Sequence, residues 1–308
     1  MFKDKRFFML KIAFSSLYSH PLPSGHRFPM EKYELLPEQL LYEGTVRDEN
    51  FFVPGMIDEH WILNTHEKEY LEKLKTLQLN KSEIRATGFP LSQILVEREI
   101  NILSGSVEAA LFAGKFGIAI NIAGGTHHAF ADRGEGFCLL NDLAITANYL
   151  LENQLAQKVL VIDLDVHQGN GTAAILGKRQ NVFTFSMHGE KNYPHRKEQS
   201  HLDCGLPDKT GDNEYLSKLR VCLDQILGQF EPDFILYQCG VDVLESDQLG
   251  RLSMTIEGIK ERDKTVLNLA KSLKIPIMCC MGGGYSKRVS LIVEAHAQVF
   301  RLAQEMYF

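Results

Sequence analysis

Two carboxylates and an imidazole follow a run of apolar residues in the middle of the chain. The apolar run covers residues 159–162, and Asp163, Asp165 and His167 come after it at every second position. In a strand, alternate side chains project from the same face, so these three polar groups are expected to lie together. Because unpaired charges are costly to bury, a divalent cation is the simplest partner for them. The sequence therefore predicts a metal site at the carboxyl end of a buried strand.

A third carboxylate, Asp242, follows another apolar segment at residues 233–238. With Asp165 and His167 it would provide three protein ligands and leave one position for water, which is the pattern of a catalytic zinc site. An Asp–His–Asp set would also suit ferrous iron. Asp163 is expected to orient a histidine from behind the ligands. The alternative for Asp242 is that it stabilises a turn, as aspartate commonly does.

Adjacent histidines, His127 and His128, follow a glycine pair at 124–125. Hydrolysis at a metal centre needs a proton acceptor for water and a proton donor for the leaving group, and two imidazoles of unequal pKa can fill both roles. Asp163 and Asn170 are the available partners that would orient the two rings. The alternative is an ordinary polar loop, so the catalytic roles of the histidines are hypotheses.

An aromatic residue follows each of two further glycine-containing segments. Tyr285 comes after three glycines at 282–284, and its phenol could donate to a developing oxyanion opposite the metal. Phe137 comes after Gly136 and could form the wall of a narrow apolar channel. The alternative for each aromatic side chain is ordinary packing, over a glycine turn or in the core.

Segments with strand and helix patterns alternate along the chain. Strands are expected at residues 11–15, 51–54, 117–122, 159–162, 181–186, 233–238 and 275–281. Helices are expected around 33–41, from an N-cap at Thr65 through 77, after 169–171, and at 91–115, 142–151, 212–229, 255–273 and 287–308. This alternation predicts an α/β fold with a central, mainly parallel sheet flanked by helices, and no linker divides residues 1–308, which are expected to form one domain. The strands that precede the polar motifs would end at one edge of the sheet, where ligands bind in such folds.

The composition is that of a globular protein, with 308 residues of which 44% are hydrophobic and 23% charged. The formal net charge is −6 and no block of Lys or Arg stands out, which argues against nucleic acid or an anionic membrane as the main partner. The six cysteines show no Cys-x-x-Cys spacing, which predicts free thiols in a reducing compartment, the cytoplasm. No apolar run has the length that a membrane span requires.

The N-terminus, residues 1–14, is basic and then apolar, as a signal peptide would be. Lys11 interrupts the apolar run and no clear cleavage site of small residues follows, so a first strand is the preferred interpretation. Met9 would suit a second start site, which would make the first eight residues a dispensable extension.

Five motifs, in this order, resemble those of the histone deacetylase superfamily: GGTHHAF, GEGFCLLND, DLDVHQGNG, QCGVD and GGGY. Other segments resemble the class IV branch and its bacterial relatives, namely HQGNG in place of HHGDG, GHRFPM near the N-terminus, ATGFPLS at 86–92 and GYSKR at 284–288. The resemblance spans nearly the whole chain. It implies the arginase–deacetylase fold, a central parallel sheet between helices.

The resemblance implies that Asp165, His167 and Asp242 bind zinc. It also implies a structural potassium ion near the same strand end. The residues around that ion would be Asp163, Asp165, His167, Ser186 and Met187.

The resemblance further implies the catalytic residues and the substrate channel. His127 and His128 match the family's catalytic pair, and Tyr285 matches the tyrosine that polarises the scissile carbonyl. Gly136 and Phe137 match the walls of the channel for acyl-lysine.

One position departs from the family's pattern: Asn170 stands where many members have aspartate, whereas Asp163 matches the usual partner of His127. A neutral amide stabilises an imidazolium less than a carboxylate does. We therefore expect His128 to be largely neutral at pH 7 and to act as the general base, passing its proton later to the leaving amine. Asn170→Asp should then shift the acidic limb of the pH–rate profile to higher pH.

The motifs together imply a zinc-dependent amidohydrolase that removes acyl groups, acetyl and also long-chain fatty acyl, from the ε-amine of lysine in proteins or peptides. The alternative within the superfamily is a small-molecule deacylase such as an acetylpolyamine amidohydrolase, which an acidic channel rim and a dimer that narrows the mouth would favour. A non-catalytic acyl-lysine binder would not need Tyr285 and the ligands, and an arginase-like two-metal enzyme would need carboxylates beyond Asp165 and Asp242. The sequence indicates neither the physiological substrate nor the oligomeric state.

Overall fold

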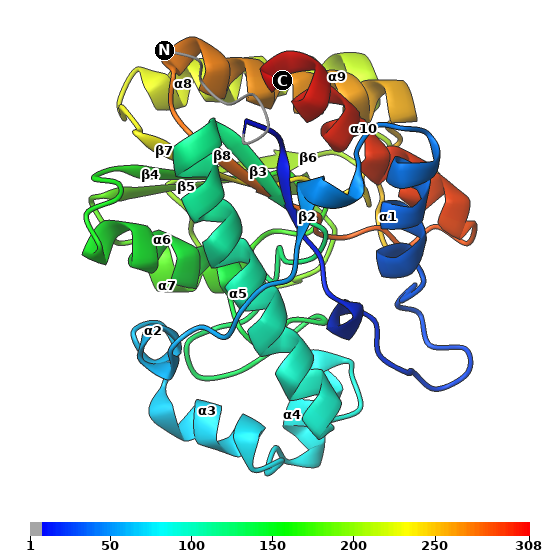
Figure 1. Ribbon diagram of the computed structural model, residues 1–308, viewed down its shortest axis with the longest axis vertical. Helices are drawn as coiled ribbons and strands as arrows, with labels where there is room; N and C mark the ends of the chain where they lie inside the picture. Colours follow the sequence, from blue (N-terminus) through cyan, green and yellow to red (C-terminus); the bar gives the residue numbers. More distant parts are fainter. Residues whose placement is uncertain (1–7) are drawn as a thin grey trace.

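The computed structural model describes residues 8–308, and its centre is a single eight-stranded sheet (Figure 1). The strand order is β2-β1-β3-β8-β7-β4-β5-β6, and every neighbouring pair is parallel. The strands are β1 (Lys11–Ala13), β2 (Phe51–Phe52), β3 (Ile118–Asn121), β4 (Val159–Asp163), β5 (Val182–Gly189), β6 (Leu202–Leu206), β7 (Phe234–Gln238) and β8 (Ile277–Cys280). The predicted parallel α/β architecture is therefore confirmed.

Both faces of the sheet are buried, as the side chains of β4 illustrate. Val159 and Val161 belong to the apolar core on one face, whereas Leu160 and Ile162 belong to the core on the other face. A strand covered on both faces consists of a continuous apolar run rather than an alternating pattern. This is the reason that β4 could be recognised in the sequence.

Helices cover the sheet in two groups (Figure 1). One group packs in the order α8, α9, α10 and α1, and the other group contains α5, α6 and α7. The α-helices are α1 (Lys32–Tyr42), α2 (Glu59–Leu63), α3 (Lys68–Lys75), α4 (Lys81–Thr87), α5 (Gln93–Phe116), α6 (Asp142–Glu152), α7 (Asn170–Leu176), α8 (Asp212–Leu227), α9 (Ile256–Leu273) and α10 (Val289–Tyr307). Two short 3-10 helices, η2 (Ser16–Tyr18) and η3 (Asp48–Asn50), precede α1 and β2.

Four strands with polar residues after their carboxyl ends are consecutive neighbours in the sheet. Their order is β3, β8, β7 and β4, and because all are parallel, their carboxyl ends lie at the same edge. The loops that carry the histidine pair, the three glycines, Asp242 and the Asp-x-His motif therefore start next to one another. This adjacency is what positions the candidate site.

The strand β4 ends at Asp163, so the prediction that Asp165 and His167 extend it with alternating side chains is wrong. The Asp163 carboxylate accepts a hydrogen bond from the backbone N–H of Asp165, 3.2 Å away. A local side-chain bond of this kind competes with the strand ladder and favours a bend. The bend, rather than strand alternation, turns the next two polar side chains toward the sheet edge.

Two further differences concern helix starts. Helix α3 begins at Lys68, and the predicted N-cap Thr65 instead accepts a hydrogen bond from Asn148 Nδ2 at 2.8 Å. Helix α4 was not expected, although Asn80 and Glu83 form a reciprocal capping box at its start. A residue of this type followed three positions later by glutamate is a recognisable helix signal, so α4 was predictable from local sequence.

At the N-terminus, β1 begins at Lys11 as predicted but ends at Ala13. The predicted dispensable extension covers residues 1–7, which lie outside the described part of the chain, together with Phe8. Among residues 8–308, no helix combines the length and the apolar character that crossing a membrane requires.

Candidate metal and catalytic site

Asp165, His167 and Asp242 meet where β4 and β7 end. One ligand atom from each side chain lies within 4.8 Å of the others, and all three residues are buried. His167 Nδ1 is 3.0 Å from Asp165 Oδ1 and 3.0 Å from Asp242 Oδ2. The structure therefore brings together the three side chains that the sequence pattern nominated as metal ligands.

Backbone donors fix the two carboxylates. Asp165 Oδ1 accepts from the N–H of His167 (3.0 Å), and its Oδ2 accepts from the N–H of Gly283 (2.8 Å). Asp242 Oδ1 accepts from the N–H of Val166 at 2.9 Å. A Cβ at Gly283 would lie 2.1 Å from Asp242 Oδ2, so only glycine can bring this backbone against the carboxylates. The triple glycine after β8 is thus a packing requirement of the site.

The electrostatics of the three side chains favour a bound positive charge. Burial lowers the pKa of His167, but its hydrogen bonds to the two aspartates raise it to about 10. Burial and the charge of Asp165 raise the pKa of Asp242 to about 7. Two carboxylate oxygens and one imidazole nitrogen are a donor set that suits zinc or ferrous iron. The residues present therefore fit the divalent cation that the sequence predicts.

The two adjacent histidines have different partners. His127 Nδ1 is 2.6 Å from Asp163 Oδ2, and His128 Nδ1 is 2.6 Å from Asn170 Oδ1. Their ring centroids are 4.1 Å apart. The structure thus places both rings beside the partners that were expected for them.

The surroundings of the two imidazoles shift their pKa values in opposite directions. Burial lowers the pKa of His127, but the charges of Asp163 and Asp165 more than offset it, so the pKa is raised. Burial and the neighbouring rings of His127 and His167 hold the pKa of His128 well below its usual value. Environments that separate two pKa values in this way define an acid and a base. His128 has the electrostatics of a neutral base.

The tautomer of His128 follows from its partner. Asn170 directs its Nδ2 toward Glu135 Oε2 at 3.4 Å, which leaves Oδ1 facing the ring. An amide oxygen only accepts hydrogen bonds, so the Nδ1 of His128 carries the proton. Its Nε2 is then left with a free lone pair, as a general base requires.

The loop that carries the histidines is held by a residue that the sequence analysis missed. Asp142, at the start of α6, accepts from the backbone N–H groups of Gly125 (3.1 Å) and Thr126 (2.8 Å). It also accepts from Thr126 Oγ1 at 2.8 Å. The carboxylate lies in the quoted motif GEGFCLLND, but no periodicity or spacing pointed to its role.

Gly136 and Phe137 form one wall of a cavity that His128 and His167 also line, and they adopt an uncommon backbone conformation. Their φ angles are +53° and +66°, which is unusual for a bulky residue such as Phe137. The N–H groups of Gly136 and Phe137 donate to the carbonyls of Ala86 (2.9 Å) and Thr87 (2.7 Å) at the end of α4. A Cβ at Gly136 would lie 2.6 Å from the ring of His128. The backbone at Gly136 therefore packs directly against the ring of His128.

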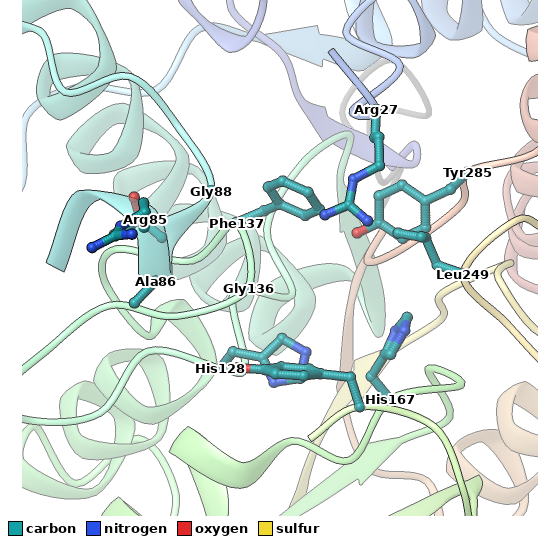
Figure 2. A pocket seen from close by; sticks show the side chains of 12 residues that line it. Arg27, Arg85, Ala86, Gly88, His128, Gly136, Phe137, His167, Leu249 and Tyr285 are labelled. Carbon is teal, nitrogen blue, oxygen red and sulfur yellow. The ribbon is translucent and has the colours of Figure 1, made fainter. Parts of the chain in front are cut away.

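Tyr285 completes a cavity of about 270 Å³ that opens to the surface (Figure 2). Its ring centroid is 6.4 Å from that of His167 and 5.9 Å from that of Phe137. Burial and the charges of nearby aspartates raise the pKa of its phenol well above 10, so the phenol is a hydrogen-bond donor. Tyr193, which was not predicted as a site residue, also lines the cavity, with its ring 5.0 Å from that of His128. Tyr193 follows β5, the strand next to β4, and this position in the sequence could have indicated that it lies at the site.

Two other missed residues hold the loops of the site. Asp247 Oδ2 accepts from the backbone N–H of Tyr285 at 2.6 Å. Arg262, which is buried on α9, donates to the carbonyls of Gly240 (2.6 Å) and Cys239 (3.2 Å) just after β7. No sequence pattern indicated the role of either residue, because each holds a loop that is distant from it in the sequence.

The residues predicted to surround a potassium ion lie next to one another. Ser186 is opposite Asp163 in the register of β4 and β5, and Met187 follows it. The Ser186 hydroxyl contacts His188 Nδ1 at 2.9 Å. The potassium ion itself stays a prediction.

Comparisons with known proteins identify the family. The model of the histone deacetylase domain matches residues 26–300. An uncharacterized protein of Picosynechococcus sp. is 41% identical over 290 residues, which are 94% of this chain and 97% of the relative. Histone deacetylase 2 of Arabidopsis thaliana is 30% identical over 278 residues, 87% of this chain and 72% of that protein. The chain belongs to the histone deacetylase family, and it is an amidohydrolase of the deacetylase type.

The fold is also that of solved family structures. The crystal structure of a histone deacetylase homologue from Aquifex aeolicus superposes with a TM-score of 0.81 at 22% identity, over 94% of this chain and 82% of that chain. The predicted arginase–deacetylase fold is thus confirmed.

Proposed function

We propose that the protein is a zinc-dependent deacylase that hydrolyses the amide of N6-acyl-lysine in proteins or peptides. The observation that carries the proposal is the convergence of the Asp165, His167 and Asp242 trio with the histidine pair and Tyr285 beside one open cavity. We further propose that residues 1–308 form one catalytic domain of class IV type and that the protein acts in the cytoplasm. All six cysteines are free thiols, which suits a reducing compartment.

Each polar side chain has a role that its surroundings support. A dication held by Asp165, His167 and Asp242, zinc or alternatively ferrous iron, would supply Lewis-acid polarisation. His128 takes a proton from the attacking water at Nε2 and later delivers it to the lysine amine.

The remaining catalytic groups stabilise charge. His127, protonated beside Asp163, keeps a positive charge next to the reacting amide. The phenol of Tyr285 donates a hydrogen bond to the amide oxygen as negative charge develops there.

The space at the base of the channel supports acetyl-lysine as the preferred substrate. A cavity of about 40 Å³ lies between Tyr285, the histidines and the side chains of Phe28 and Ile102. Since a single water needs roughly 10–15 Å³ of such space, this cavity has room for only a few atoms. That is enough for an acetyl group, whereas a long fatty-acyl chain would require these side chains to move.

The test is a panel of lysine peptides whose acyl groups range from acetyl to myristoyl, assayed with and without a chelator. We expect hydrolysis of acetyl-lysine to be fastest, to stop with chelator and to return when zinc is added. The variant Asp242→Asn should be inactive, whereas Asp224→Asn, on the exposed side of α8, should behave as the wild type. Full activity in excess chelator, or no hydrolysis of any acyl-lysine peptide, would reject the proposal.

A further inference from the structure

The outer end of the channel carries two arginines and, among the residues that line it, no carboxylate. Arg27 and Arg85 both line the cavity that leads to His128, His167 and Tyr285. Figure 2 shows Arg27 directed between the rings of Phe137 and Tyr285, and Arg85 at the end of α4 on the other side of Phe137. Both arginines are exposed to solvent, so they form a rim rather than part of the core.

Backbone hydrogen bonds hold the segment of Arg85 against the channel, and side-chain contacts hold the segment of Arg27. Arg85 lies in the last turn of α4, and the next two carbonyls, Ala86 and Thr87, accept the hydrogen bonds from the channel wall described above. On the other segment, His26 Nε2 is 2.9 Å from the carbonyl of Gly88. Phe28 is buried, with its ring centroid 5.3 Å from that of Phe137. The segments flanking both guanidinium groups are therefore anchored to the channel.

The charge of the rim is not neutralised. Within residues 8–308, neither Arg27 nor Arg85 forms an ion pair with a carboxylate. The nearby carboxylate of Glu135 is paired with Arg133 at 2.9 Å and accepts from the hydroxyl of Tyr193 at 2.9 Å. A local positive region thus lies at the channel mouth of a chain whose net charge is −6. Clefts lined by one sign of charge concentrate ligands of the opposite sign.

We propose that Arg27 and Arg85 are specificity-determining residues that select acyl-lysines flanked by acidic residues. This inference rests on the proposed deacylase function and names its substrate class, an acidic peptide segment that carries acyl-lysine. The same charges repel acetylated polyamines, which are cationic and would need an acidic rim. Because the guanidinium groups are exposed, the preference is modest and declines as salt screens it.

The test compares three acetyl-lysine peptides of equal length with aspartate, serine or lysine on both sides of the acetyl-lysine, and N-acetylspermidine. At roughly 50 mM salt, kcat/KM for the aspartate peptide should exceed that for the lysine peptide by roughly three- to tenfold. The ratio should approach one at about 0.5 M salt, where the screening length is only a few ångströms. N-acetylspermidine should be a poorer substrate than the serine peptide.

Matched variants test whether Arg27 and Arg85 cause the preference for the aspartate peptide. Arg27→Gln and Arg85→Gln should each lower the aspartate-to-lysine ratio, and the double variant should bring it near one. Arg27→Lys and Arg85→Lys, which retain the charge, should keep most of the ratio. Arg220→Gln, an exposed arginine on α8 outside the cavity, should leave the ratio unchanged.

The results distinguish failure of the rim inference alone from failure of the deacylase function itself. Equal rates for the aspartate and lysine peptides at low salt, or a ratio that the double variant leaves intact, would overturn the inference while the deacylase function stands. Faster hydrolysis of N-acetylspermidine than of the serine peptide would also overturn it. If no peptide is hydrolysed, both the inference and the proposed function are rejected.

Discussion

The floor and the rim of the channel are built in different ways. The floor consists of the polar groups that follow β3, β4, β7 and β8, namely the histidine pair, the Asp165, His167 and Asp242 trio, and Tyr285. Each carboxylate of the trio is fixed by at least one backbone N–H. The rim consists of two exposed side chains, Arg27 and Arg85. The segment of Arg85 is joined to the channel wall by backbone hydrogen bonds, and the segment of Arg27 is held by contacts of His26 and Phe28. A substitution in the floor can leave a buried charge without its partner. A substitution in the rim alters only a charge that water already solvates.

The difference predicts where single substitutions matter. Removing one partner from a buried polar network exposes the full desolvation cost of the group that remains. Exposed charges contribute little individually, although they can set a preference among substrates. We therefore expect chemistry to depend on the floor and substrate choice to depend on the rim.

Among substitutions outside the metal-ligand trio, the largest effect is expected for Tyr285→Phe. The substitution keeps the ring that packs 5.9 Å from Phe137 but removes the phenol that donates to the developing oxyanion. Loss of one such donor typically lowers kcat by about 100- to 1,000-fold. Tyr42→Phe is the control, because Tyr42 is 95% exposed and outside the cavity. A Tyr285→Phe enzyme within threefold of the wild-type kcat would remove the tyrosine from the account.

Gly136→Ala should come next, with a loss of kcat/KM of roughly tenfold or more. The new Cβ would meet His128 Cδ2 at 2.6 Å, so either the general base or the channel wall must shift. Gly114→Ala is a matched control, since nothing lies within 4 Å of a Cβ at Gly114. Full activity in Gly136→Ala, with the fold intact by circular dichroism, would show that the wall does not position His128.

Asn170→Asp should change the pH dependence more than the maximal rate. A carboxylate beside His128 Nδ1 favours the imidazolium, so the pKa of His128 rises. A general base acts only when neutral, and activity is therefore lost as the pH falls through its pKa. The acidic limb of kcat/KM against pH should move to higher pH, with a roughly tenfold loss at its acidic end. If the limb stays in place, His128 is not the base.

The smallest effect concerns the element that supports the rim. Asn80→Ala removes the side chain that caps α4, and such a loss typically costs about 1 kcal/mol of stability. Urea denaturation should show this difference against Ser82→Ala, whose hydroxyl lies in the same turn. Because α4 carries Arg85, KM for an acidic peptide should rise slightly while kcat stays the same. A loss of kcat comparable to that of Tyr285→Phe would contradict the separation of floor and rim.

The same division explains what the sequence could predict. The floor depends on short motifs that follow apolar strands, so Asp165, His167, Asp242 and the histidine pair could be predicted from the sequence alone. The parallel sheet followed from alternating segments. Even the error about the end of β4 left the ligand prediction unchanged, because the bend after Asp163 brings the same side chains to the sheet edge.

The residues that were missed act across long separations in the chain. Asp142 holds the loop before His127 from the start of α6, and Arg262 holds the loop after β7 from α9. Arg27 and Arg85 meet at one cavity only because their segments fold against the channel wall. No local period encodes such contacts. The exception is α4, whose capping box was visible in the sequence.

The most direct test of the central claim is zinc binding by the metal-free protein, measured by calorimetry together with the melting temperature. We predict that the wild type and Asp224→Asn bind zinc at the Asp165–His167–Asp242 site, that zinc raises their melting temperature, and that acetyl-lysine hydrolysis returns in proportion to occupancy. Asp242→Asn should lose all three responses. Zinc binding of unchanged affinity in Asp242→Asn would contradict the account.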